Sequence, residues 1–257
     1  MKPKALVLRA PGTNCDQETA HAFQLAGGDA EFMHINQLIE NPSATRDYQI
    51  LCVPGGFSFG DDIGAGRILA SKFTSRLKDT IEEFRAAEKL VLGICNGFQV
   101  LIKTGFLVPS DEHGLPVTLT WNHNGRYDCR WVNLRQVGSN CVFTRDTDQM
   151  YLPIAHAEGR FVVRDSQTLA SLIDGKQLAL KYVNPDGSNG HVPHPFNPNG
   201  SDENIAGICD QSGRVFGLMP HPERFIDRTQ HPRWTRLPKD LPADGLKIFE
   251  NAVSYFA

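Results

Sequence analysis

The chain has 257 residues, of which 40% are hydrophobic and 21% charged, and its formal net charge is −3. This composition is ordinary for a globular protein, and the length suits one large α/β domain, so we expect residues 1–257 to form a single domain. The absence of a basic stripe argues against a nucleic-acid partner. No apolar run approaches the ~20 residues that a membrane span needs, so no membrane partner is expected.

The first half of the chain alternates between strand and helix patterns. In chain order, strands are expected over 5–9, 30–34, 50–53 and 90–94, and helices over 13–25 and 74–87, with a further helical pattern after residue 95. This alternation predicts a parallel sheet of the flavodoxin-like type with helices on both faces. The active sites of such sheets lie beyond the carboxyl ends of the strands.

The second half is richer in strands. We expect extended segments over 117–121, 129–134, 177–183, 204–209 and 214–219, and a closing helix over 244–255. Residues 184–202 are dense in Pro, Gly, Asn and His and predict a long loop. The expected fold is therefore an open, mostly parallel α/β sheet with extra antiparallel strands in its second half.

The cysteines are scattered and form no CxxC pair, which argues against a zinc site and a disulfide framework. This pattern favours a reducing cytoplasm, and the N-terminus carries no signal-peptide pattern. The six cysteines are Cys15, Cys52, Cys95, Cys129, Cys141 and Cys209.

One cysteine stands at a sharp strand-to-helix turn. Cys95 follows the apolar run 90–94 and is flanked by Gly93 and Gly97, and a helical pattern comes next. This is the G-x-nucleophile-x-G elbow with sulfur in place of a serine oxygen. A helix N-terminus favours thiolate over thiol, so the turn predicts a nucleophile.

A histidine and a carboxylate follow a second predicted strand end. His221 comes directly after the apolar run 214–219, and Glu223 stands two residues later, where an extended chain points both side chains to the same side. We expect Glu223 to orient His221, and His221 to act as the base for Cys95. A Pro-His-Pro-Glu run by itself is more often a surface turn, and a buried cysteine is more often inert packing, so the inference depends on their combination.

The glycine pair at 55–56 follows the strand predicted at 50–53. Attack on an amide creates an oxyanion that needs preorganised N–H donors, and the predicted donors are Gly56 and Asn96. A simple strand-ending turn would use the same two glycines, so both interpretations stay open here.

Together these motifs resemble the class I (triad) glutamine amidotransferases, and within them the glutaminase subunits of phosphoribosylformylglycinamidine synthases. The resemblance covers nearly the whole chain. The Cys95 and His221 motifs are shared by the whole superfamily. Three runs indicate this subunit more specifically, namely 14–16 (NCD), 57–61 (FSFGD) and 155–160 (AHAEGR). The matching runs are 12–16 (GTNCD), 54–61 (PGGFSFGD), 93–99 (GICNGFQ), 153–161 (PIAHAEGRF), 197–201 (NPNGS) and 219–224 (MPHPER).

The resemblance implies a reaction. Cys95 would attack the side-chain amide of L-glutamine and form a γ-glutamyl thioester, while His221 and Glu223 complete the triad. Gln99 and His156 would bind the substrate. The released ammonia would pass to a large synthetase subunit, which would hold the ATP and Mg²⁺, and a small third subunit is expected. No cofactor and no metal are expected in this chain.

The sequence departs from this family at residues 61–67, and the segments 184–202 and 227–242 look longer than in minimal relatives, which suggests contact surfaces. His191, His194 and His231 are expected to be solvated rather than metal ligands. Two other interpretations stay open: a glutaminase or Cys-His hydrolase that serves another reaction, and a non-catalytic structural or redox partner.

Overall fold

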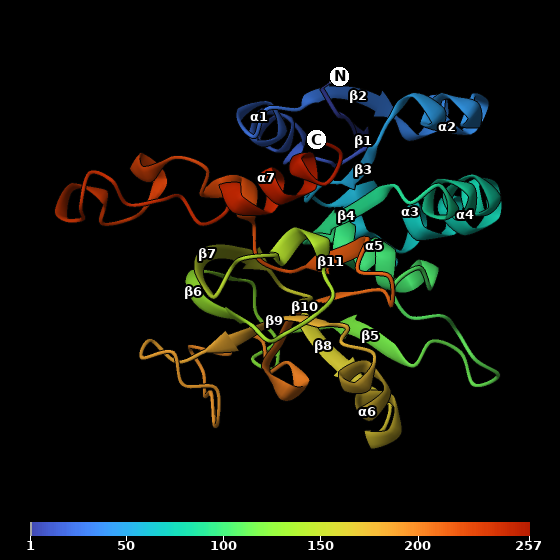
Figure 1. The fold of residues 1–257 in the computed structure, drawn as a ribbon. Coiled ribbons are helices and arrows are strands. Elements are labelled where there is room, and N and C mark those ends of the chain that lie inside the picture. The colour runs from blue at the N-terminus through green and yellow to red at the C-terminus, as the bar shows by residue number, and fades with distance from the viewer. Residues whose placement is uncertain (1) are drawn as a thin grey trace.

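The computed structural model describes residues 2–257, and a nine-stranded sheet runs through them in the order β2-β1-β3-β4-β11-β10-β9-β6-β7 (Figure 1). Four pairings at one end of this order are parallel, and they join five strands. This is the flavodoxin-like order, in which the carboxyl ends of the strands meet at one edge. The five strands are β1 (Lys4–Arg9), β2 (Asp29–His34), β3 (Ile50–Val53), β4 (Leu90–Ile94) and β11 (Val215–Leu218).

The other end of the sheet is antiparallel throughout. Its strands are β10 (Ile205–Cys209), β9 (Leu178–Val183), β6 (Asp128–Gln136) and β7 (Gln149–His156). A separate two-stranded sheet pairs β5 (Val117–Thr120) with β8 (Arg160–Val163). The expected fold class is therefore confirmed, including the extra antiparallel strands.

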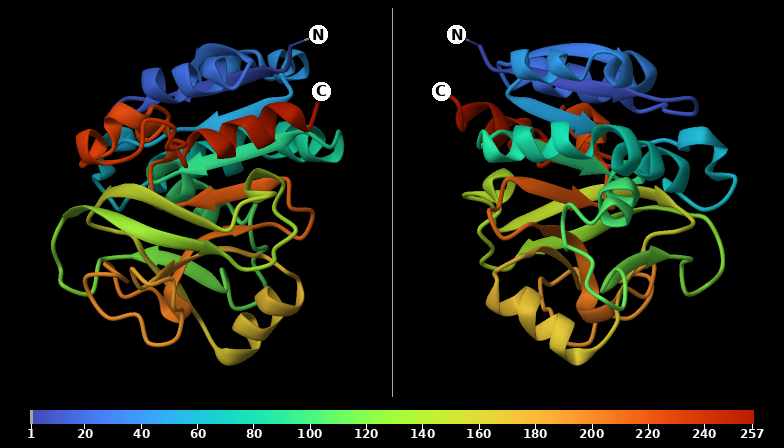
Figure 2. Two further views of the ribbon diagram at one scale, coloured as in Figure 1. Left: turned by 60° about the vertical axis from the view of Figure 1, so that its left-hand side comes forward. Right: turned by 90° about the vertical axis from the view of Figure 1, so that its right-hand side faces the viewer.

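Helices cover both faces of the parallel part. α1 (Asp16–Leu25) and α7 (Leu246–Ser254) lie together on one side, where the rings of Phe23 and Phe249 stand 4.9 Å apart (Figure 1). α3 (Arg67–Lys72), α4 (Lys78–Ala86) and α5 (Asn96–Thr104) lie on the other side, as the two views of Figure 2 show. The helices α2 (Ile35–Glu40) and α6 (Ser166–Asp174) complete the set. Short 3-10 helices cover Pro42–Asp47, Ser58–Asp61, Val142–Thr144, Asp202–Asn204, Pro222–Arg224, Arg228–Gln230 and Trp234–Arg236.

Several expected boundaries were wrong. The helix expected from residue 13 begins at Asp16, because Thr13 forms an isolated β-bridge with Gly56. The helix expected over 74–87 begins earlier, at Arg67, and passes through a π-helical turn at Phe73–Leu77. The strands β7 and β8 and the helices α2 and α6 were not expected at all. The loop expected over 184–202 is confirmed, since neither a strand nor an α-helix lies between β9 and β10.

Within residues 2–257, no helix combines the length and the apolar character that crossing a bilayer requires.

Candidate active site

Cys95 stands in a strained turn between β4 and α5. Its backbone has φ 49° and ψ −103°, a left-handed conformation that non-glycine residues seldom adopt. The two flanking glycines make this turn possible. A Cβ added to Gly93 would lie 2.7 Å from the carbonyl oxygen of Gly97, and a Cβ added to Gly97 would lie 1.8 Å from that of Val53. The close approach of α5 to β3 and β4 therefore requires glycine at both flanking positions of the Gly-x-Cys-x-Gly pattern.

The adjacent strand end carries the histidine. β11 pairs in parallel with β4, with Leu218 opposite Ile94, and the amide of Cys95 donates a 2.8 Å hydrogen bond to the carbonyl of Leu218. The chain then turns, and the amide of His221 donates to the carbonyl of Pro153 on β7 at 2.8 Å. Residues that are 126 positions apart in sequence thus come from neighbouring strand ends.

His221 and Glu223 form a buried pair. Nδ1 of His221 lies 2.6 Å from Oε1 of Glu223, and both side chains are almost fully excluded from solvent. Burial alone would lower the pKa of His221. The Glu223 carboxylate and the sulfurs of Cys95 and Cys15 outweigh burial, and together they hold the pKa of His221 well above its usual value. Since Nδ1 is engaged, Nε2 is the ring nitrogen left for proton transfer, and it has no hydrogen-bond partner among residues 2–257.

The Gly56 loop and the start of α5 are tied together. Gly56 follows β3 at φ 145°, and the side-chain oxygen of Asn96 accepts a 3.1 Å hydrogen bond from the amide of Ser58. The amide nitrogen of the Asn96 side chain donates to Asp61 at 3.1 Å and to Gln99 at 2.9 Å. The Gly56 loop and the first residue of α5, which carry the two expected oxyanion donors, are therefore held together. Their role in catalysis stays a prediction.

Gln99 and His156 are both buried and both bonded to the protein. Nε2 of Gln99 donates to the carbonyl of Glu158 at 2.6 Å, and Nδ1 of His156 lies 3.1 Å from Oδ1 of Asn122. Burial, reinforced by the nearby charge of His221, lowers the pKa of His156 to about 3, so this ring is neutral at physiological pH. One polar atom of the ring, Nε2, is buried without a hydrogen-bond partner among residues 2–257.

The sequence interpretation missed a second thiol beside the His221–Glu223 pair. Cys15 is buried, and its sulfur accepts a 3.1 Å hydrogen bond from Nη2 of Arg224. Nε of Arg224 in turn donates to Glu18 on α1 at 3.0 Å. The signal was present, because Cys15 lies in the GTNCD run and Arg224 directly follows Glu223, but no local pattern joins residues 209 positions apart.

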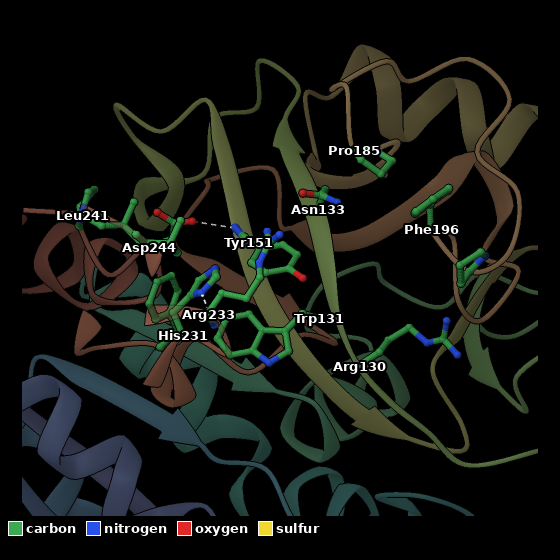
Figure 3. Close-up of a pocket in the computed structure, with 14 residues that line it drawn as sticks. Arg130, Trp131, Asn133, Tyr151, Pro185, Phe196, His231, Arg233, Leu241 and Asp244 are labelled. Carbon is green, nitrogen blue, oxygen red and sulfur yellow. Dashed lines mark hydrogen bonds between the residues drawn. The ribbon is translucent and has the colours of Figure 1, made fainter. Parts of the chain in front are cut away.

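The two segments singled out in sequence, 184–202 and 227–242, meet at a cavity of about 510 Å³ over β6 and β7 (Figure 3). Phe196 comes from the first segment, and Arg233 and His231 come from the second. The expectation that His231 is solvated was wrong: it is 5% exposed, because it packs among aromatic rings at 5.4–5.6 Å. These rings belong to Trp131, Tyr151 and Phe225.

Comparison with known proteins identifies the family of this chain. The model of one family, described as the CobB/CobQ-like glutamine amidotransferase domain, matches residues 2–256. The chain belongs to this glutamine amidotransferase family. It is therefore an enzyme of the class that uses glutamine as amido donor, as the Cys95 and His221 motifs predicted.

Several relatives match this chain over nearly their full length. The phosphoribosylformylglycinamidine synthase subunit PurQ of Dehalococcoides mccartyi is 47% identical over 99% of this chain and 98% of its own length. The PurQ subunit of Methanococcus maripaludis is 44% identical over 99% of this chain and 97% of its own. Among solved structures, a chain of the PurLQS complex of Thermotoga maritima is 32% identical, covers 100% of both chains and has a TM-score of 0.75.

Proposed function

We propose that this chain is the glutamine-hydrolysing subunit of a phosphoribosylformylglycinamidine synthase and supplies ammonia for purine biosynthesis. One observation of the structure carries the proposal. The adjacent ends of β4 and β11 bring an elbow cysteine to a buried His-Glu pair whose free ring nitrogen is unpartnered among residues 2–257. Identities of 44–47% to subunits named PurQ, over nearly the full length, support the choice of synthase.

The chemistry follows from the placement of these groups. The sulfur of Cys95 transfers its proton to Nε2 of His221 and attacks the side-chain amide carbon of L-glutamine. The tetrahedral intermediate collapses as His221 returns the proton to the leaving nitrogen, which departs as ammonia and leaves a γ-glutamyl thioester. His221 then takes a proton from water, which attacks the thioester carbon. The C–S bond breaks, Cys95 leaves as a thiolate and takes the proton back from His221, and glutamate is released. Glu223 holds the imidazole in the required tautomer through Nδ1.

The remaining residues of the site have supporting roles in this proposal. The backbone N–H groups of Gly56 and Asn96 would stabilise the oxyanion. His156 would offer its unpartnered Nε2 to the substrate. The side-chain oxygen of Gln99 already accepts one hydrogen bond and would offer its second lone pair to the substrate. Because Gly56 stands in a loop bridged to Thr13, we also propose that the partner rearranges this loop when glutamine is to be cleaved.

The partners and the compartment belong to the same proposal. The acceptor chemistry, with its ATP and Mg²⁺, would reside in a large synthetase subunit, and a small third subunit would complete the complex. The name PurLQS of the Thermotoga maritima structure, to which this chain is similar over its full length, supports this composition. All six cysteines are free thiols, in keeping with a cytoplasmic location.

The test is glutamate release from glutamine by the purified chain, with and without the synthetase subunits, ATP and formylglycinamide ribonucleotide. We expect release to rise strongly in the full mixture and to vanish in Cys95→Ala. The same variant assembled with its partner should still use free ammonia. Strong release that ignores the synthetase would point to a different acceptor reaction, and no release under any condition would favour a non-catalytic subunit.

A further inference from the structure

The second thiol beside the triad has no role in the mechanism above. Cys15 immediately precedes α1 and is 1% exposed. Its sulfur and the Cε1 atom of His221 both lie against Gly55, since a Cβ added there would stand 3.0 Å from the sulfur and 2.8 Å from Cε1. The sulfur therefore packs beside the triad imidazole.

A metal site is the first possibility for this cluster. The sulfur of Cys15, a ring nitrogen of His221 and a carboxylate oxygen of Glu223 lie within 4.8 Å of one another, and all three residues are buried. The same sulfur, however, accepts a hydrogen bond from the guanidinium of Arg224, and a positive charge at 3.1 Å opposes a bound cation. The cluster is better explained as a hydrogen-bonded network.

In this network the guanidinium of Arg224 has two acceptors. Nε donates to Glu18 at 3.0 Å and Nη2 donates to the sulfur of Cys15 at 3.1 Å. The sulfur donates its own proton to Oδ1 of Asn14 at 3.2 Å. Burial raises the pKa of Cys15 and keeps it a protonated thiol, which can accept from the guanidinium.

The neighbouring carboxylate is an alternative partner for that guanidinium. Glu223 directly precedes Arg224, and its Oε2 atom is buried without a hydrogen-bond partner among residues 2–257. An ion pair between the two would neutralise the charge that favours the protonated form of His221. In the structure, Arg224 is held by Cys15 and Glu18, and Glu223 keeps its hydrogen bond to His221.

We propose that Cys15 is a positioning residue that keeps the Arg224 guanidinium from pairing with Glu223, so that the carboxylate charge acts mainly on His221. This inference rests on the proposed function and assigns a role to a residue that does not itself react. Without the sulfur, Arg224 would turn to Glu223 and make His221 a weaker base.

The test compares Cys15→Ala with the wild-type chain, each assembled with its synthetase partner, by the pH dependence of kcat for glutamate release. We expect the apparent pKa of the acid limb to fall by about one unit, which is about a tenfold change in the protonation constant, with a lower plateau rate. In an Arg224→Gln background, Cys15→Ala should move the acid limb less, because only the direct contact of the sulfur with His221 is then lost. Cys15→Ser should give a smaller shift and serves if Cys15→Ala does not fold.

The matched control is Cys141→Ala, which removes an equally buried sulfur. It should leave the pH profile unchanged. The role of Cys15 would be overturned if the wild-type chain releases glutamate and Cys15→Ala leaves the acid limb unmoved. An equal shift of the acid limb in the Arg224→Gln background would overturn it as well. If the wild-type chain releases none, the proposed function fails instead. The ionisable groups that act on the pair from packed elements are Cys15 itself, Cys52, Cys95, Tyr127, His156 and Arg224.

Discussion

Replacing Gly97 by alanine tests how tightly the elbow is packed. The added Cβ would lie 1.8 Å from the carbonyl oxygen of Val53, and side-chain Cβ atoms essentially never approach closer than 3.0 Å, so β3 and α5 must separate by at least 1.2 Å. Overpacking of this kind costs ~1–3 kcal/mol, and the upper end applies because the atom that must move is backbone. Alanine has a helix propensity ~1 kcal/mol better than glycine, which offsets only part of this cost.

The expected net loss is therefore at least ~2 kcal/mol, or a fall in Tm of ~4–8 °C for a chain of this size. Thermal unfolding by circular dichroism, together with glutamate release, measures both consequences. We expect activity to fall as well, because β3 leads into the Gly56 loop and α5 begins beside Cys95. The matched control is Gly190→Ala, where an added Cβ meets nothing within 4 Å. A Gly97→Ala variant as stable and active as Gly190→Ala would refute the packing argument.

Three further predictions concern the buried polar groups. Glu223→Gln should lower kcat by ~10²–10⁴-fold with little change in KM, because the charge that orients and stabilises the imidazolium is lost. In steady-state kinetics, the control Glu250→Gln, at an exposed position, should leave kcat unchanged, and an equal effect of both variants would contradict the role of Glu223. The unfolded chain protonates His156 near pH 6.5 and the folded chain only near pH 3, so this residue costs stability as the pH falls. In denaturant titrations from pH 6 to 5, His156→Gln should therefore lose up to ~1.4 kcal/mol less than wild type, and equal losses would contradict the assignment. Asn122→Ala should lower stability by at least ~2 kcal/mol in the same assay, since Asn122 bonds His156, Gly159 and Arg126; a loss no larger than that of exposed Asn36→Ala would be the contrary result.

The sequence predicted what depends on short-range patterns. Buried parallel strands are near-continuous apolar runs, and β3 and β4 were located to the residue. Cys95 and His221 each follow such a run, so the topology of a parallel sheet places them at one edge.

The antiparallel strand β7 escaped prediction for an identifiable reason. Pro153 stands in its middle, and proline argues against a central strand, but β7 is the last strand in the sheet order and an edge strand tolerates it. The helix α6 could have been found. Asp165 caps it by accepting a hydrogen bond from the amide of Thr168 at 2.7 Å, which is the expected N-cap pattern.

Contacts between distant segments could not be predicted from the chain alone. Thr13 looks helical by pattern, yet its bridge to Gly56 delays α1 until Asp16. The Arg224–Cys15 hydrogen bond joins residues that are 209 positions apart and likewise has no local signal. A network of this kind follows from the tertiary fold, whereas the triad follows from motifs that each strand end carries separately.

The most direct test of the account is to trap the covalent intermediate. The chain, assembled with its synthetase partner, is mixed with glutamine and quenched in acid within one turnover, and intact-mass and peptide-mass spectrometry locate any adduct. We predict a mass increase of one glutamyl group on Cys95 alone, absent from Cys95→Ala. An adduct on another cysteine, or glutamate release that persists in Cys95→Ala, would contradict the assignment of Cys95 as the nucleophile.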